Sequence, residues 1–374
     1  MKIAVLGAGM VGSAIALDLA KDFHVTSFDL DKLNLKLLKE KNNAIDTVVQ
    51  NLKELSSYES FLRPFNLVVT AVPGFMGFDT LKTVIGCGKN VVDISFFPED
   101  ALQLDALAKE KDVTVIVDCG VAPGMSNYII GRYNKEMKID DFEIYVGGLP
   151  VHPKQPFNYK APFSPIDVIE EYTRPARLKE NGTIVTKPAL TDLELIEFEG
   201  LGMLEAFNTD GLRSLLYTMS HIPNQKEKTL RYPGHVSLIT ALQQSGFFSK
   251  EKIMVDGKEV SPLDFSSQIL LREWKMEENE EELTVMKVVL HGEGKTIEYH
   301  LLDYYNAATQ TSSMARATGY TCTASVNLLV NKLFSKKGVF PPELIGDDKV
   351  CFDFVVYYLK ERSVIWKKKE YALV

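Results

Sequence analysis

The first third of the chain alternates short apolar runs with segments in which apolar residues recur every three or four positions. The opening run, residues 2–6, leads through a glycine-rich segment into a helical pattern in which Val11, Ile15 and Leu19 share one face. Further strand-like runs occupy 24–29, 43–46, 66–71, 90–95 and 113–118. Six strands that alternate with helices predict an α/β fold, a Rossmann-type doubly wound parallel sheet.

The pattern changes after residue 127. Strand-like runs, several with two-residue alternation, lie at 142–148, 195–198, 285–291 and 297–303, and helical stretches lie at 165–171, 211–220 and 235–245. A long helical pattern follows at 314–333, and we expect it to pack back onto the first part of the chain. The sequence therefore predicts one domain from 1–127 and 306–374, and an inserted α+β domain from 128–305.

Composition excludes several classes of protein. The 374 residues are 45% hydrophobic and carry a net charge of −8, which suits two globular domains. No apolar stretch approaches the roughly 18 residues of a membrane span, and the acidic balance argues against a nucleic-acid partner. The four cysteines form no CxxC pair, and Met1-Lys2 leads directly into the first strand. We expect a reduced, cytoplasmic protein with no membrane or nucleic-acid partner.

The glycine-rich segment Gly7-Ala8-Gly9-Met10-Val11-Gly12 is a GxGxxG motif between a strand and a helix. In this context the first glycine permits a tight turn, the second lets a pyrophosphate approach the backbone, and the third lets helix and strand pack closely. Asp29 follows 22 residues after Gly7, at the end of the second strand. A carboxylate there hydrogen-bonds both ribose hydroxyls and repels a 2′-phosphate, so NAD is favoured as the cofactor, while nearby Lys32 keeps NADP open.

Ligands of such sheets bind outside the carboxyl ends of the strands. We therefore predict that the dinucleotide contacts the glycine motif and the residues that follow the strands. The candidates are Gly7, Ala8, Gly9, Met10, Val11, Gly12, Asp29, Leu30, Asp46, Ala71, Val72, Pro73, Ser95, Phe96, Gly120, Val121, Ala122 and Pro123. For any single proline or glycine among them, ordinary loop chemistry is the alternative.

Later motifs occur in the order of a known family. They are Asp118-x-Gly-x-x-Pro-Gly, Tyr145-Val-Gly-Gly-Leu-Pro150, Tyr159-Lys-x-x-Phe-Ser-Pro165, Thr229-Leu-Arg-Tyr232 and Ala317-Thr-Gly-Tyr320. Together they resemble the saccharopine dehydrogenase (glutamate-forming) family over nearly the whole chain. The segment 162–177 and Glu205-Ala-Phe-x-x-Asp-Gly-Leu-Arg213 are similar to its L-lysine 6-dehydrogenase branch. Fungal saccharopine reductases have Asn-Arg-Asp where this chain has Asn208-Thr209-Asp210.

The resemblance implies an enzyme that passes a hydride from C6 of lysine to NAD, after which the imine hydrolyses to allysine and ammonia. Asp118 is the candidate for the amine end, and its alternative role is to cap the loop at 120–124. Arg213 and Arg231 are candidates for the substrate carboxylate, because the arginine fork matches a carboxylate. Either arginine could instead lie at the surface or in an internal ion pair.

Lys160, Tyr145 and Tyr159 are candidate acid–base groups near the cleft. Tyrosines in strand patterns are commonly half-buried core residues, which is the alternative for both. No histidine, cysteine or carboxylate cluster has the spacing of metal ligands, so we predict no metal.

Two other functions stay open. One is a related reductive amination, such as saccharopine dehydrogenase (glutamate-forming) activity. The other belongs to a different class, a non-catalytic NAD-binding sensor or structural subunit, because binding NAD does not itself imply catalysis. In the leading interpretation, residues 128–305 bind a small amino acid, L-lysine, and the chain forms a homo-oligomer.

Overall fold

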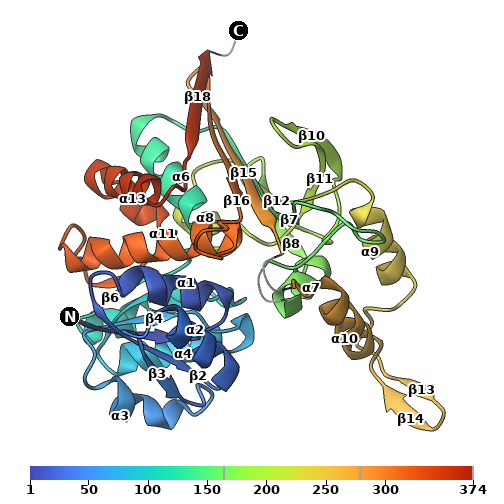
Figure 1. Cartoon of the computed structure of the whole chain (residues 1–374). Helices are drawn as coiled ribbons and strands as arrows, with labels where there is room; N and C mark the ends of the chain where they lie inside the picture. Colours follow the sequence, from blue (N-terminus) through green and yellow to red (C-terminus); the bar gives the residue numbers. More distant parts are fainter. Residues whose placement is uncertain (163–164, 278–279, 373–374) are drawn as a thin grey trace. The chain divides into compact units, whose positions relative to one another are not determined.

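The chain divides into two compact units. The structure, a computed structural model, describes residues 1–162, 165–277 and 280–372. The first unit comprises Met1–Ile139, Arg213–Ser220 and Met314–Trp366, and the second comprises Asp140–Leu212, His221–Ser313 and Lys367–Val374 (Figure 1). The functional domains expected from the sequence, with limits at 127 and 305, stay a prediction.

The first unit is built on a parallel sheet of seven strands in the order β17-β6-β5-β4-β1-β2-β3. The strands are β1 (Lys2–Leu6), β2 (His24–Asp29), β3 (Asp46–Val49), β4 (Leu67–Thr70), β5 (Asn90–Asp93), β6 (Thr114–Ile116) and β17 (Gly338–Phe340). The doubly wound parallel sheet is confirmed, but the prediction of six strands was wrong. The seventh, β17, pairs with β6 through Gly338 and Thr114, and three residues before two prolines carry too short a pattern to reveal a strand.

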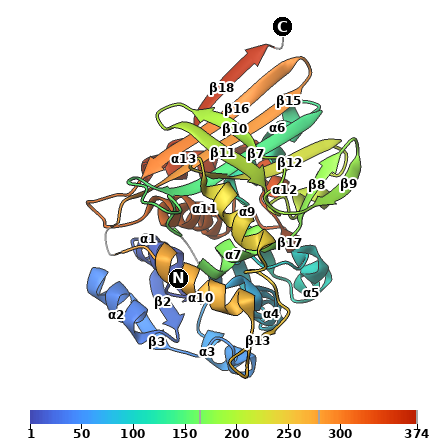
Figure 2. The same ribbon diagram turned by 90° about the vertical axis from the view of Figure 1, so that its right-hand side faces the viewer.

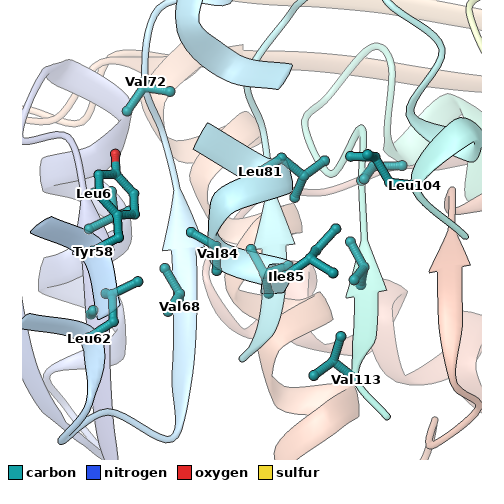
Figure 3. Close-up of a cluster of buried hydrophobic side chains, with 14 of the residues drawn as sticks. Leu6, Tyr58, Leu62, Val68, Val72, Leu81, Val84, Ile85, Leu104 and Val113 are labelled. Atoms are coloured by element: carbon teal, nitrogen blue, oxygen red, sulfur yellow. The ribbon is translucent and has the colours of Figure 1, made fainter. Parts of the chain in front are cut away.

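Helices cover this sheet and complete the core of the unit. They are α1 (Met10–Leu19), α2 (Lys32–Lys41), α3 (Tyr58–Leu62), α4 (Gly74–Gly86), α5 (Asp105–Glu110), α6 (Met125–Glu136), α8 (Leu215–Thr218), α11 (Ser313–Val330), α12 (Glu343–Gly346) and α13 (Lys349–Glu361), with 3-10 turns at Leu55–Ser57 and Ala101–Leu104. Leu81, Val84 and Ile85 of α4 pack with Val68 of β4 and Leu6 of β1 (Figure 3). Because helices cover both faces of a parallel sheet, its strands have continuous apolar runs in the sequence.

A buried carboxylate ties α1 to two helices from the end of the chain. Asp18, 2% exposed, accepts hydrogen bonds from the hydroxyls of Thr323 on α11 and Tyr358 on α13, at 2.7 and 2.8 Å. It also accepts from Arg362 Nε at 2.8 Å and from Lys21 Nζ at 2.9 Å. The helix that follows the glycine motif is therefore fixed to the C-terminal helices of the same unit.

The second unit is built on a mixed sheet of nine strands (Figure 2). The main path is β10-β11-β12-β7-β15-β16-β18, with β8 paired to β12 and β9 paired to β8. The strands are β7 (Asp141–Pro150), β8 (Ala176–Glu180), β9 (Thr183–Lys187), β10 (Glu194–Phe198), β11 (Gly202–Asn208), β12 (Asn224–Arg231), β15 (Glu282–Gly292), β16 (Lys295–Tyr304) and β18 (Lys367–Ala372). Strand β7 pairs in parallel with β12 and antiparallel with β15, so the sheet is mixed.

Three helices and a small hairpin complete the second unit. The helices are α7 (Pro165–Thr173), α9 (His235–Gln244) and α10 (Pro262–Trp274), and the hairpin consists of β13 (Ile253–Val255) and β14 (Lys258–Val260). The helix expected at 211–220 was too long: only α8 is helical, and this segment lies in the first unit. Throughout the described part of the chain, no helix combines the length and apolar character needed to cross a bilayer.

Candidate active site

The glycine motif forms a backbone cradle at the carboxyl end of β1. Gly7 has a φ of 110°, and a Cβ there would overlap with the carbonyl oxygen of Ala71. A Cβ on Gly12 would overlap with the carbonyl oxygen of Gly7. Only glycine therefore fits either position, as the motif predicts.

The space above the cradle is open. Gly9 is exposed, and a Cβ built on it would meet no atom within 4 Å. Gly9 also precedes α1, whose first turn has neither a capping side chain nor an acidic residue. Free N–H groups at a helix N-terminus beside open space fit a phosphate, so these residues fit a dinucleotide.

Asp29 joins the end of β2 to this cradle. Its Oδ2 accepts a hydrogen bond from the N–H of Ala8 at 2.6 Å, and its Oδ1 accepts from the N–H of Asp31 at 2.8 Å. Asp29 is half-buried, whereas Leu30 is exposed. The backbone thus holds one carboxylate beside the glycine motif and places the second, that of Asp31, two residues later.

The carboxyl end of β6 carries a buried ion pair. Asp118 Oδ1 lies 2.8 Å from Arg213 Nε, and neither side chain is more than 5% exposed. Arg213 also donates through Nη1 to the carbonyl of Phe97, and its guanidinium lies 5.0 Å from the ring centroids of Phe96 and Phe97. Asp118 and Arg213 both have positive φ, 56° and 46°. Such backbone costs about 1–3 kcal/mol per residue and clusters at functional sites.

Burial raises the pKa of Asp118 above its ordinary range, and the Arg213 guanidinium opposes that rise. Among the described residues, Arg213 is the hydrogen-bond partner of the Asp118 side chain, and it uses Oδ1. The second oxygen, Oδ2, makes no hydrogen bond to the described residues.

The loop at 120–124 is closed by its own backbone. Gly120 N–H donates to the carbonyl of Pro123, and Met125 N–H donates to the carbonyl of Gly120, both at 3.0 Å. Gly124 has a φ of 143°, and a Cβ there would overlap with Gly120. The loop is thus closed by backbone hydrogen bonds, and the Asp118 carboxylate bonds to Arg213 instead of capping the loop.

The segment that carries Arg213 is held by a second buried carboxyl. Glu343 is fully buried and accepts from Asn127 Nδ2 at 2.8 Å and from the Thr218 hydroxyl at 2.6 Å. Asn127 Nδ2 also lies 3.5 Å from the Ser214 hydroxyl. The sequence analysis missed Glu343, because its place after two prolines gives no sign of burial.

A third buried carboxyl ends β5. Asp93 is fully buried and accepts a hydrogen bond from the hydroxyl of Thr70, at the end of β4, at 2.5 Å. Burial raises the pKa of Asp93 to about 7. The sequence analysis named Ser95 in this segment but missed Asp93 and Thr70. The sequence does show one sign of Asp93: it is the acidic residue at the end of the apolar run that forms β5.

Arg231 belongs to a closed network in the second unit. Its Nη2 lies 3.1 Å from Glu171 Oε2, its Nε donates to the Tyr172 hydroxyl at 2.9 Å, and its guanidinium lies 4.3 Å from the Tyr159 ring centroid. His235 Nδ1 lies 2.8 Å from the carbonyl of Phe157, which can only accept. Nε2 of the neutral ring therefore accepts from Tyr172, 2.9 Å away. Burial, with help from Arg231, lowers the pKa of His235 to about 3.

The other candidates in the second unit have separate partners. Tyr145 donates to Glu143 Oε2 at 2.8 Å, and burial raises the pKa of Tyr145. The Lys160 ammonium donates to the carbonyls of Glu273 and Lys275 at 2.9 and 3.2 Å. The structure thus brings Asp118, Arg213 and Phe96 together, and it joins Arg231 to Tyr159 rather than to Tyr145 or Lys160. Within the described residues, no group of three or more histidines, cysteines or carboxylates could hold a metal.

A parallel doubly wound sheet with a glycine cradle and a carboxylate after its second strand defines a dinucleotide-binding protein. Residues 3–116 match the profile of the saccharopine dehydrogenase NADP binding domain, and residues 117–363 match the saccharopine dehydrogenase C-terminal domain. The chain belongs to the saccharopine dehydrogenase family. The resemblance to this family found in the sequence is confirmed, and the similarity to its L-lysine 6-dehydrogenase branch stays a prediction.

Relatives include alpha-aminoadipic semialdehyde synthase, mitochondrial, of Mus musculus, 24% identical over 279 residues, which are 70% of this chain and 30% of the mouse protein. Another is saccharopine dehydrogenase [NADP(+), L-glutamate-forming] of Pyricularia oryzae, 27% identical over 199 residues, 50% of this chain and 44% of the fungal protein. The match therefore spans less than half of each relative. Apo saccharopine dehydrogenase (L-Glu forming) from Saccharomyces cerevisiae has the same fold, with a TM-score of 0.80, 18% identity and coverage of 99% and 100% of the two chains.

Proposed function

We propose that the protein is an NAD-dependent oxidoreductase that removes the ε-amino group of L-lysine and releases allysine and ammonia. The observation that carries the proposal is Asp118, a buried carboxylate at the nucleotide-binding edge of the sheet with one oxygen bound to Arg213 and the other making no hydrogen bond to the described residues. A buried anion with such an oxygen suits a cationic substrate group such as the lysine ammonium.

Asp118 has two tasks in this scheme: to orient the amine and to accept its proton. A lysine ammonium with a pKa of about 10.4 costs roughly 4.6 kcal/mol to deprotonate at pH 7. Burial raises the pKa of Asp118 and so makes it a stronger base than an exposed aspartate, which lowers that cost. Arg213 is a positioning residue that fixes Asp118 Oδ1. NAD, when bound, accepts the hydride from C6.

The residues after β2 support NAD over NADP. Asp29 is fixed beside the glycine motif by Ala8, and Asp31 adds a second carboxylate. Two negative charges at this position repel a 2′-phosphate. We therefore propose NAD as the preferred cofactor, although the matching family profile bears the name of an NADP binding domain.

The number of carboxylates on the substrate distinguishes lysine from saccharopine. Saccharopine has three carboxylates and needs several cations, whereas lysine has one. Arg213 and Arg231, the two arginines singled out from the sequence, are each paired with a carboxylate of their own unit. Neither arginine is therefore free for a substrate carboxylate, and this counts more against saccharopine, which has three carboxylates, than against lysine, which has one. The second candidate, the reductive joining of allysine to glutamate, is supported by the names of the mouse and fungal relatives.

The test is a coupled pair of assays. Purified protein with L-lysine and NAD should form NADH and ammonia in equal amounts. The reverse reaction should run with allysine, NADH and ammonia. Turnover only when glutamate replaces ammonia would overturn the lysine proposal in favour of saccharopine chemistry. Nucleotide binding without turnover of either substrate would point to a non-catalytic NAD-binding protein.

We also propose a homo-oligomer in a reducing, cytoplasmic compartment. The four cysteines of the chain form no disulfide, and Cys119, Cys322 and Cys351 are buried. Buried thiols suit a compartment in which disulfides do not form. Light scattering coupled to size exclusion should give a mass at least twice the 41.9 kDa of one chain, and a mass of 41.9 kDa would contradict the proposal.

A further inference from the structure

The carboxyl end of β5 holds two buried polar atoms that lack a close hydrogen-bond partner among the described residues. They are Asp93 Oδ2 and Ser95 Oγ, neither of which has a hydrogen-bond partner among the described residues. Asp93 is 0% exposed and Ser95 is 3% exposed. Unsatisfied buried polar atoms are rare in native proteins and ask for an explanation.

Their place in the sheet gives one. Asp29 lies at the end of β2, on one side of β1, and it marks the ribose of the adenosine half of a dinucleotide. The opposite neighbour of β1 is β4, followed by β5. A dinucleotide that crosses the glycine motif therefore brings its nicotinamide half to the end at which Asp93 and Ser95 lie.

We propose that Asp93 is a proton-exchanging group that responds to the charge of the nicotinamide, losing its proton when the cationic, oxidised ring binds and keeping it when the neutral, reduced ring binds. The proposal rests on the nucleotide-binding part of the proposed function and not on the identity of the amino-acid substrate. Asp93 would thereby couple proton release to the redox state of the bound cofactor.

The surroundings of Asp93 allow it to titrate near neutral pH. Burial raises the pKa of Asp93 to about 7, the Thr70 hydroxyl and the neighbouring side chain and N–H of Ser95 oppose the rise, and the negative charge of Asp118 adds to it. The other titratable neighbours are Cys119, which follows β6, and Cys322 on α11. Burial raises the pKa of both thiols well above the ordinary value, so they stay neutral.

The positive charge of an oxidised nicotinamide ring at this edge would shift the ionisation equilibrium of Asp93. It stabilises ionised Asp93 and therefore lowers its pKa in the complex. A fall of about one unit from 7 corresponds to release of about 0.4 proton at pH 7 and to at most about tenfold tighter binding of the oxidised cofactor above pH 7. The neutral ring supplies no such charge, so its binding should release no proton from this group.

Isothermal titration calorimetry tests the proposal without an amino-acid substrate. NAD and NADH are each titrated into the full-length protein near pH 7 in buffers of different ionisation enthalpy. The slope of the binding enthalpy against the buffer enthalpy gives the protons released. We expect about 0.4 proton with NAD and near zero with NADH. Equal release with both cofactors would overturn the proposal.

Two variants locate the group. Asp93→Asn should abolish the release of protons with NAD. Asp22→Asn, which changes an exposed carboxyl of the same unit, should leave the release unchanged. Release that persists in Asp93→Asn would overturn the assignment to Asp93, and its loss in Asp118→Asn instead would assign it to Asp118.

An infrared measurement on the unaltered protein covers the case in which Asp93→Asn does not fold. The carbonyl band of a protonated carboxylic acid should weaken when NAD binds and should persist when NADH binds. An unchanged band with NAD would contradict the proposal. Failure of the lysine assay leaves these measurements unaffected, so the two proposals fail separately.

Discussion

Asp118 and Arg213 are separated by 95 positions in the sequence, yet they form one buried ion pair. Each lies in the left-handed backbone region, and each is almost fully buried. The pair shows why a motif alone could not assign these residues. A sequence can indicate that an aspartate follows a strand, but the partner that sets its charge comes from a distant segment.

Asp118→Asn keeps the shape of the side chain and removes its charge and basicity. We expect kcat for lysine oxidation to fall about 10²–10⁴-fold, the usual contribution of a positioned general base, while the Kd for NAD stays within about threefold. Steady-state kinetics and calorimetric NAD binding measure the two effects. Asp22→Asn, at an exposed turn, is the control, and unchanged kcat in Asp118→Asn would remove this residue from the mechanism.

Arg213→Lys keeps the positive charge but loses the fork that contacts both Asp118 and the Phe97 carbonyl. We expect kcat to fall by about tenfold or more and the alkaline-rising limb of the pH profile to move, because the cation that opposes the rise of the Asp118 pKa is displaced. A purely structural role would instead lower stability without moving the profile. Arg213→Lys should therefore be compared by both pH–rate profile and thermal unfolding.

Asp29→Ser removes the carboxylate that the backbone holds beside the glycine motif. We expect kcat/KM for NAD to fall about 10–100-fold, the cost of a charged hydrogen bond, and the preference over NADP to shrink accordingly. Kinetics with both cofactors measures the ratio. Asp31→Ser should change the ratio less, because Asp31 mainly caps α2 through Leu33 N–H. An unchanged ratio in Asp29→Ser would contradict the NAD assignment.

At the scale of elements, the sequence pattern succeeded where a strand or helix is long and its period is clear. The runs at 24–29 and 66–71 became β2 and β4, because apolar side chains of a covered parallel strand appear in the sequence itself. The third strand was expected at 43–46 and lies at Asp46–Val49, at the edge of the sheet, where three of its four residues are exposed. Burial, rather than local propensity, makes a strand visible in the sequence.

The contact between α1 and the C-terminal helices offers a test at this scale. Burial by itself would raise the pKa of Asp18, but hydrogen bonds from Arg362, Lys21 and Thr323 outweigh it and hold the pKa below 3.8. Because the pKa of the folded state lies below that of the unfolded state, ionised Asp18 stabilises the fold above about pH 4, and this stability is lost as the pH falls through the folded pKa.

Asp18→Asn should therefore lower the free energy of unfolding by about 3 kcal/mol near pH 7, since it leaves Arg362 half-buried without its partner. The difference from the unaltered protein should shrink below about pH 4. Urea unfolding at several pH values measures both. A difference that does not depend on pH would show that packing, and not the charge of Asp18, is responsible.

At the scale of the whole molecule, the chain returns to each unit more than once. The first unit takes β17, α11 and α13 from beyond residue 312, and the second unit takes its edge strand β18 from 367–372. The segment 213–220 leaves the second unit for the first and delivers Arg213 to Asp118. The nucleotide-binding unit is therefore incomplete until the chain is nearly finished.

Two truncations test this. A chain that ends at residue 312 lacks β17 and the helices bound to Asp18, so it should show no cooperative unfolding and no binding of NAD. A chain that ends at residue 366 loses only β18 of the second unit and should still bind NAD. Calorimetric titration and thermal unfolding compare the two, and cooperative unfolding with NAD binding in the shorter chain would contradict the expectation.

Features that depend on neighbouring residues can be predicted from the sequence: the glycine motif, the spacing to Asp29 and the alternation of strands with helices. Each of these features depends on interactions within a few positions. At Gly7 and Gly12 the backbone leaves no room for a Cβ, so the residue type itself indicates the local geometry. Which buried polar groups pair with one another depends on the tertiary structure. Asn127 donates a hydrogen bond to Glu343, 216 positions away in the sequence, and Arg362 donates one to Asp18, 344 positions away. No local pattern encodes such pairs, because burial alone would destabilise each charge and only the partner brought by the fold compensates it.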